Sequence, residues 1–156
     1  MSNFIYLSKE RLREIEQELN ELKLGGRKKM AERIAEARSH GDLSENAEYD
    51  AAKEEQGMLE LKISKLEELL SKAQIIDTNS LPKDKVHILS VVKVKNLNNK
   101  KEFTYKLVSA EEADLEQMKI AYTSPVGKAL MGAKLGDIVT ANVPAGIIKF
   151  EILSIE

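Results

Sequence analysis

The chain has 156 residues, a length that suits one or two small domains. Its formal net charge is −2, so attraction to nucleic acid through net charge is not the main clue to function. It contains no cysteine, so disulfides and thiolate metal sites are excluded and a reducing compartment is favoured. The chain start resembles no signal peptide and no stretch has membrane-spanning length, so we expect a cytoplasmic protein without membrane contact.

The first predicted element is a long amphipathic helix. Ser8 is its expected N-cap, and apolar residues then recur in alternating steps of three and four from Leu12 to Leu22, the pattern of a coiled-coil seam. Two adjacent glycines at 25–26 each cost about 1 kcal/mol in a helix interior. Because the periodicity resumes at Met30, we expect a kink or a loosened turn there and not the end of the helix.

A second helix shows the same alternation from Tyr49 to Ala73. Near the connection between the two helices the seam residues are the small side chains Ala37 and Ala52, so the helices can approach closely there. The two arms predict an antiparallel coiled-coil hairpin about 45 Å long at about 1.5 Å per residue. Gly41 is expected to end the first arm in a left-handed conformation, and Asp42 or Ser44 to cap the second.

Beyond a linker at 77–82 the period changes to that of strands. A small α+β domain with a strongly bent antiparallel sheet and one short helix is predicted. Its expected elements are strands over 86–94, 103–108, 138–143 and 147–155, a turn at 98–99, and a helix opened by Ser124-Pro125 and closed by Gly132. The domains are therefore 1–77, with net charge −4 and an acidic tip at 41–50, and 78–156, with net charge +2.

The tip carries the most informative chemistry. Asp42 and Glu45 stand three residues apart, on one side of a helix start, where the helix dipole favours ionised carboxylates. Such a pair suits Mg²⁺ and can orient a metal-bound water, but two exposed acids bind the ion weakly unless a partner already holds it. The same spacing is also a helix-start signal, with Glu45 returning a hydrogen bond to the cap, and on spacing alone this structural interpretation stays open.

The motif from Ala37 to Tyr49, continued from Ala51 to Gln56, resembles the tip of the bacterial Gre transcript cleavage factors, of the GreA type. The resemblance extends over essentially the whole chain. It implies that residues 78–156 form a domain like that of the FK506-binding proteins, which docks at the rim of the RNA polymerase secondary channel.

The activity that the resemblance implies is that of an accessory factor and not of an enzyme. The coiled coil would enter the channel and stimulate the polymerase's own Mg-dependent cleavage of the 3′ end of backtracked RNA, which rescues arrested elongation complexes. The chain would bind no cofactor stably, because the Mg²⁺ is shared with the polymerase. Its expected partners are RNA polymerase and the nascent RNA, DNA contact within the elongation complex is left open, and a monomer is expected.

The resemblance also assigns roles to individual tip residues. Asp42 and Glu45 match the two acids that help to hold the shared Mg²⁺ and activate water. Asn46, Glu48 and Tyr49 match residues that support them.

The resemblance also assigns roles to basic residues and to residues that dock on the polymerase. Arg38 and Lys53 match residues that face the extruded RNA, although arginine is common where Lys53 stands, and lysine lacks the bidentate fork for phosphate. Ser124 and Pro125 match the surface that docks on the polymerase. A second basic cluster over 27–33 is either a solvated helix face or a surface for RNA or polymerase.

Three rival hypotheses remain from the sequence. A Gre-like inhibitor would occupy the channel without stimulating cleavage, although the retained tip acids argue against it. A peptidyl-prolyl isomerase or chaperone would need an aromatic-lined pocket, for which the second domain offers four aromatic residues and no tryptophan. A stand-alone Mg²⁺ nuclease lacks an enclosed site.

Overall fold

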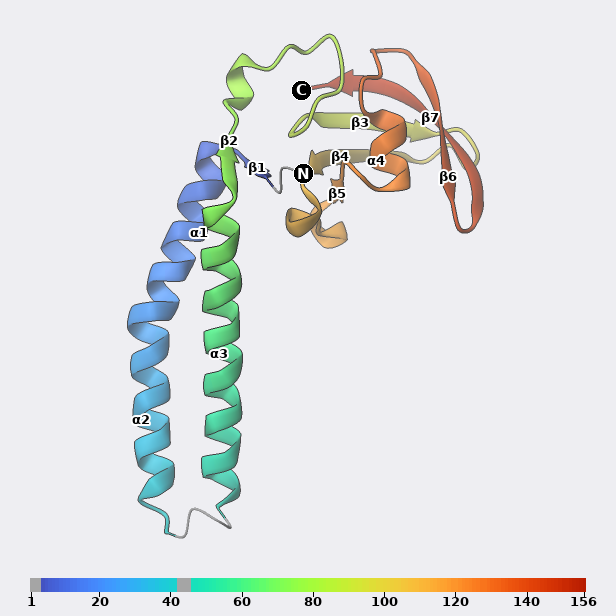
Figure 1. Ribbon diagram of the computed structural model, residues 1–156. Helices are drawn as coiled ribbons and strands as arrows, with labels where there is room; N and C mark the ends of the chain where they lie inside the picture. Colours follow the sequence, from blue (N-terminus) through green and yellow to red (C-terminus); the bar gives the residue numbers. More distant parts are fainter. Residues whose placement is uncertain (1–3, 42–45) are drawn as a thin grey trace. The chain divides into compact units, whose positions relative to one another are not determined.

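The computed structural model describes residues 4–41 and 46–156 (Figure 1). The chain divides into two compact units. One is Glu10–Lys72, and the other is Ala73–Glu156 together with the N-terminal segment up to Lys9. The first is an antiparallel helical hairpin and the second is built around a β-sheet, as the sequence predicts.

The first arm of the hairpin is α1 (Lys9–Glu21), η1 (Leu22–Gly26) and α2 (Arg27–Arg38), and the second arm is α3 (Ala47–Ser71). The η1 segment is a π-helix, which confirms the expectation of a loosened turn at the two glycines. In a π-helix each hydrogen bond spans one residue more than in an α-helix.

This π-helical segment explains how the seam continues. In a strict heptad, the seam that passes through Leu22 would reach positions 33 and 36. The buried residues are instead Ile34 and Ala37, one position later. On α3 the alternation of three and four is unbroken, with Ala52 and Ile63 fully buried. The first arm therefore holds one residue more than its heptads need, and the wide turn of η1 accommodates it.

Ion pairs between the arms accompany this seam. Each joins a basic residue to a glutamate on the other helix, and each partner is substantially exposed, so a single pair contributes about 0–1 kcal/mol. Together they favour one alignment of the arms. The pairs are Glu18 with Lys62 (3.2 Å), Lys23 with Glu67 (3.3 Å), Arg27 with Glu60 (2.9 Å) and Arg33 with Glu55.

The second unit contains a small parallel pair and a five-stranded mixed sheet in the order β5-β4-β3-β7-β6. The parallel pair is β1 (Ile5–Leu7) with β2 (Ala73–Ile75). The other elements are η2 (Thr78–Ser80), β3 (Val91–Asn96), β4 (Glu102–Val108), η3 (Ala110–Glu112), η4 (Leu115–Gln117), β5 (Lys119–Ala121), α4 (Pro125–Leu130), β6 (Ile138–Val143) and β7 (Gly146–Ile155).

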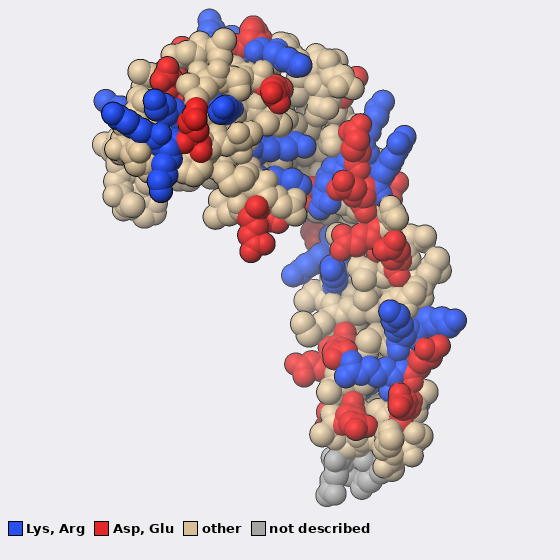
Figure 2. Space-filling view, turned by 180° about the vertical axis from the view of Figure 1, so that it is seen from behind, with Lys and Arg blue, Asp and Glu red and all other residues tan. Residues whose placement is uncertain are grey.

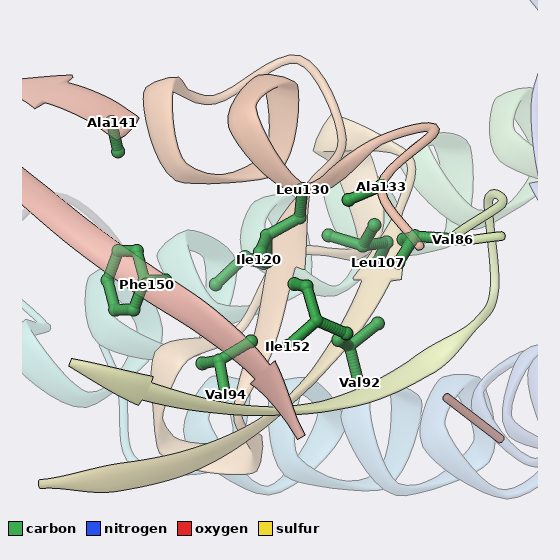
Figure 3. Packing of buried hydrophobic residues seen from close by; sticks show 10 residues of the cluster. All are labelled: Val86, Val92, Val94, Leu107, Ile120, Leu130, Ala133, Ala141, Phe150 and Ile152. Carbon is green, nitrogen blue, oxygen red and sulfur yellow. The ribbon is translucent and has the colours of Figure 1, made fainter. Parts of the chain in front are cut away.

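One face of the sheet forms the core with α4. Figure 3 shows Leu130 of α4 pointing towards the sheet beside Ile120, and Phe150 and Ile152 belong to the same buried cluster. Alternate residues of the strands supply this face, as the period of two requires. Gly127 lets α4 lie against β5, because a Cβ atom there would stand 2.1 Å from the carbonyl oxygen of Ala121.

Three details differ from the sequence-based expectation. The short parallel pair of β1 with β2 was not predicted. The strand expected over 86–94 begins only at Val91, since His87–Ser90 forms a turn in which Leu89 has φ +69° and the Ser90 hydroxyl accepts the His87 N–H (2.9 Å). The sheet, expected to be antiparallel, is mixed because β5 pairs parallel with β4.

Candidate functional site

The closed end of the hairpin is held together by Asn46. Its side-chain oxygen accepts the backbone N–H groups of Glu48 and Tyr49 (both 3.1 Å), so Asn46 is the N-cap of α3. Its amide nitrogen donates to the carbonyl oxygen of Ala37 on the other arm. The expectation that Asp42 or Ser44 caps α3 is wrong, because the cap lies directly before the first helical residue.

Two further contacts join the arms at this end. The guanidinium of Arg38 lies over the ring of Tyr49, 5.8 Å from its centroid, in a cation–π contact. The imidazole Nε2 of His40 stands 3.5 Å from a carboxylate oxygen of Glu48. With the Asn46 bond, these contacts fix the last turn of α2 against the first turn of α3. Gly41 follows with φ +118°, a conformation that favours glycine.

The predicted pair Asp42 and Glu45 lies outside the described residues. The described acids next to them, Glu48 and Asp50, are exposed and occupy the first turn of α3, where the helix dipole favours a negative charge. Within 4–41 and 46–156, no group of three or more His, Asp or Glu residues could hold a metal ion.

The basic residues of the hairpin divide into engaged and free groups. Arg27 and Arg33 are committed to cross-arm glutamates, and the bidentate bond from Arg27 raises the pKa of that guanidinium and lowers the pKa of Glu60. Lys28 and Lys29 are exposed and have no ion-pair partner among the described residues. Lys53 donates to Gln56 on its own helix (2.9 Å). The cluster over 27–33 is thus partly structural.

The second predicted site surrounds the start of α4. The Ser124 hydroxyl accepts the Gly127 N–H (3.0 Å) and donates to the carbonyl oxygen of Ala121 (2.6 Å), which ties the helix start to β5. Beside it lies an open, mainly apolar pocket of about 360 Å³. Its lining is Tyr105, Ala113, Asp114, Leu115, Lys119, Ile120, Ala121, Ser124, Pro125 and Val126. Leu115 is 76% exposed at its rim.

The sequence predicted a docking surface at Ser124 and Pro125 but no recess beside it. Leu115 and Tyr105 come from segments that meet only in the folded chain. The Ser124-Pro125 signature, which predicted the helix start, was the available signal. The two histidines differ in their surroundings. His40 is exposed and paired with Glu48, and the Nε2 atom of His87 is buried without a hydrogen-bond partner among the described residues.

Comparison with known proteins adds the family. Two family models match the chain: Transcription elongation factor, N-terminal, over residues 5–75, and Transcription elongation factor, GreA/GreB, C-term, over 81–156. The chain belongs to the GreA/GreB family of transcription elongation factors. The resemblance found in the sequence is thereby confirmed, and so is the fold class.

Curated relatives of this GreA/GreB chain agree over the full length. Transcription elongation factor GreA of Christiangramia forsetii and that of Flavobacterium psychrophilum are each 52% identical over 155 residues, 99% of this chain and 98% of theirs. GreA of Chloroherpeton thalassium is 49% identical over 156 residues, 100% of this chain and 99% of its own. Among solved structures, GreA factor homolog 1 of Thermus thermophilus is 27% identical with 99% of each chain covered and a TM-score of 0.47.

The helices described in this GreA/GreB chain were compared with the length and apolarity that a membrane span requires. None of those in residues 4–41 and 46–156 is both long and apolar enough to cross a bilayer.

Proposed function

We propose that the protein enters the secondary channel of RNA polymerase and stimulates the polymerase to cleave the 3′ end of backtracked RNA. Family membership supports a role in transcription elongation. The observation that carries the finer proposal is the clamp at the closed end of the hairpin, where Asn46, Arg38 and His40 brace the two arms. A brace at this point suits a loop whose acids act in the active site of another protein.

In this proposal the chain supplies Asp42 and Glu45 as ligands and is not itself a nuclease. A Mg²⁺ ion shared with the polymerase would activate water for attack on phosphorus. Asn46 would set the direction in which the loop leaves α2 and enters α3, because it bonds to both helices. Glu48 would orient His40 at the base of the loop, and Tyr49 would do the same for Arg38.

Arg38 and Lys53 would face the RNA 3′ segment. The contact of Arg38 with the Tyr49 ring is not a hydrogen bond, so N–H donors of the guanidinium would be available to phosphate. Lys53 is held by a weak exposed bond to Gln56, which a phosphate could replace. The polymerase rim would dock at Ser124 and Pro125, with an apolar side chain entering the adjacent pocket.

The deciding experiment uses a stalled, backtracked elongation complex with 3′-labelled RNA and Mg²⁺. Wild-type protein should release short 3′ fragments, and Asp42→Asn and Glu45→Gln should each lower the rate at least tenfold while polymerase binding persists. Glu54→Gln, an exposed acid one turn beyond the tip, is the matched control and should cleave normally. Omission of the polymerase should abolish cleavage.

Other outcomes would select the rival functions. Polymerase binding without cleavage by the wild type would make the chain a channel-occupying inhibitor. The isomerase reading is tested with a proline peptide. The pocket beside Ser124 counts against it, because the lining contains one aromatic side chain, Tyr105, among the described residues.

A further inference from the structure

The five-stranded sheet has an edge strand whose outer side is open. β6 lies at the end of the order β5-β4-β3-β7-β6, so within the sheet it pairs with β7 alone (Figure 1). At the opposite end of the sheet, β5 forms a further bridge, from Lys119 to Asp114. A strand in the position of β6 presents a row of unpaired N–H and C=O groups to any chain that comes alongside.

The register shows which residues of β6 face outward. The Ile152 N–H donates to the carbonyl oxygen of Asp137 (2.9 Å), so these two residues are a hydrogen-bonded pair. In an antiparallel ladder such pairs alternate with pairs that share no backbone hydrogen bond. The next residues of β6 to direct their backbone groups away from β7 are therefore Ile138, Thr140 and Asn142. None of these three N–H groups has a backbone partner elsewhere in the described chain.

An open recess of about 450 Å³ lies beside this edge. Its lining is Thr123, Pro125, Lys128, Ala129, Thr140 and Asn142. One wall thus comes from α4 and the turn before it, and the other comes from two of the three β6 residues whose backbone groups point outward. Unpaired donors and acceptors next to side-chain pockets are the arrangement in which an extended peptide adds a strand to a sheet.

The β6 edge lacks the usual protections against strand pairing, which are lysine, proline and bulges. Residues 138–148 include no charged residue, although 32% of the chain is charged, and Pro144 follows the end of β6. Figure 2 shows uncharged side chains, drawn tan, at the end of the sheet unit where Figure 1 places the β6–β7 turn. Ile138 and Ile147 lie on one face of the sheet and are 62% and 61% exposed. The edge is therefore accessible to a partner strand.

The charge of the recess selects the partner. Lys128 is exposed, is the one charged residue of the lining, and has no ion pair among the described residues. Two copies of this chain joined edge to edge about a two-fold axis would bring two Lys128 side chains to the shared edge, where like charges repel. A foreign strand could instead place a carboxylate beside Lys128 and an apolar side chain, on its other face, beside Ile138.

We propose that the β6 edge and its recess bind an extended segment of another protein in which acidic and apolar residues alternate. The segment would pair with the outward backbone groups of β6 and place its acidic side chains in the recess. This site goes beyond the cleavage proposal, because it uses neither the tip acids nor the pocket beside Tyr105.

The test is an NMR titration of the isotope-labelled full-length protein with a synthetic peptide. In this peptide valine and glutamate alternate over about eight residues, a usual strand length. The amide signals of Ile138, Thr140 and Asn142 should shift, and hydrogen exchange of the Thr140 amide should slow. A peptide in which valine and lysine alternate is the matched control and should bind at least about tenfold more weakly.

Two modified peptides separate strand addition from charge attraction. N-methyl groups on the valines remove the N–H donors from one edge of the peptide strand, and N-methyl groups on the glutamates remove them from the other edge. Because one edge alone pairs with β6, one modified peptide should lose binding and the other should keep it. Equal effects of the two modifications would overturn strand addition.

Protein variants test the same two features. Lys128→Glu should lower affinity for the glutamate peptide about tenfold and raise affinity for the lysine peptide by a similar factor. Lys101→Glu, in a turn separated from β6 by β3 and β7, is the matched control and should change neither. Thr140→Pro removes an outward N–H that the β6–β7 ladder does not use, so it should fold and fail to bind. Thr140→Val keeps that N–H and should bind normally.

Three further results would overturn the proposal. One is the absence of amide shifts with about 1 mM peptide, a concentration that reveals complexes with a Kd of about 1 mM. Another is an equal loss of affinity in Lys128→Glu and Lys101→Glu. The third is a change of the β6 amide signals with protein concentration in the absence of peptide, which would assign the edge to a second copy of this chain.

Discussion

Replacement of Asn46 should separate the two ways in which it holds the hairpin end. Asn46→Ala removes the N-cap of α3, worth about 1 kcal/mol, and the bond to the Ala37 carbonyl, worth about 1 kcal/mol. We expect a total loss of about 2 kcal/mol in local stability. Asn46→Asp keeps a cap oxygen and adds a charge that suits the helix N-terminus, but it cannot donate to Ala37. Its loss should therefore be about half as large.

The assay is native-state hydrogen exchange of the amides in the first turn of α3 and the last turn of α2. With Asn46→Ala both turns should exchange faster, about 30-fold for 2 kcal/mol. With Asn46→Asp, α3 should stay protected while α2 loses protection. Equal effects of the two substitutions, or exchange unchanged in both, would refute the reasoning that one amide caps α3 and also bridges the arms. Cleavage of backtracked RNA should fall in the same order.

Three further outcomes follow from the structure. Gly25→Ala should stabilise the hairpin by about 1 kcal/mol, because a Cβ atom there would meet open space. Gly26→Ala should stabilise it less, since its Cβ would lie 3.2 Å from a leucine side chain of α3. Thermal melts followed by the helical circular-dichroism signal measure both, and an equal gain in the two variants would contradict this reasoning. The pKa of Glu60 is lowered by Arg27, so that pair's contribution to stability is present above the unfolded pKa and is lost as pH falls through the folded one. In Arg27→Gln the free energy of unfolding, measured by urea titration at several pH values, should therefore decrease less as the pH falls. An unchanged dependence of stability on pH would contradict this prediction. Burial raises the pKa of Tyr105, so stability should fall as pH rises above about 10, and Tyr105→Phe should remove that fall.

Much of the fold is visible in the sequence because its signals are local. The three-four alternation predicted both arms, and the Ser-Pro and Gly signals placed α4. The missed strand β5 has three residues, too few for a period of two, and it exists because Leu107 and its neighbours on β4 offer it a parallel partner. The turn before β3 was missed because positive φ at Leu89 has no sequence signature.

The candidate site was predictable in its residues and less so in its contacts. Asn46 stood out in the motif, but its role as the cap of α3 depends on where the helix begins, the least certain feature of any pattern. Arg38 and Tyr49 were assigned separately, to RNA and to tip support, and their mutual contact arises from the packing of the arms. The placement of Asp42 and Glu45 stays a prediction, since both lie outside the described residues.

The π-helical segment has a consequence for comparing members of this family. A π-helical turn of this kind forms when one residue is inserted into an α-helix and the same residues on either side stay buried. A homologue one residue shorter between Leu22 and Gly26 would have a continuous α-helix with the same seam towards α3. Alignments of such pairs should therefore place their gap within these five positions, so that Ile34 and Ala37 remain matched to buried residues and not to their exposed neighbours.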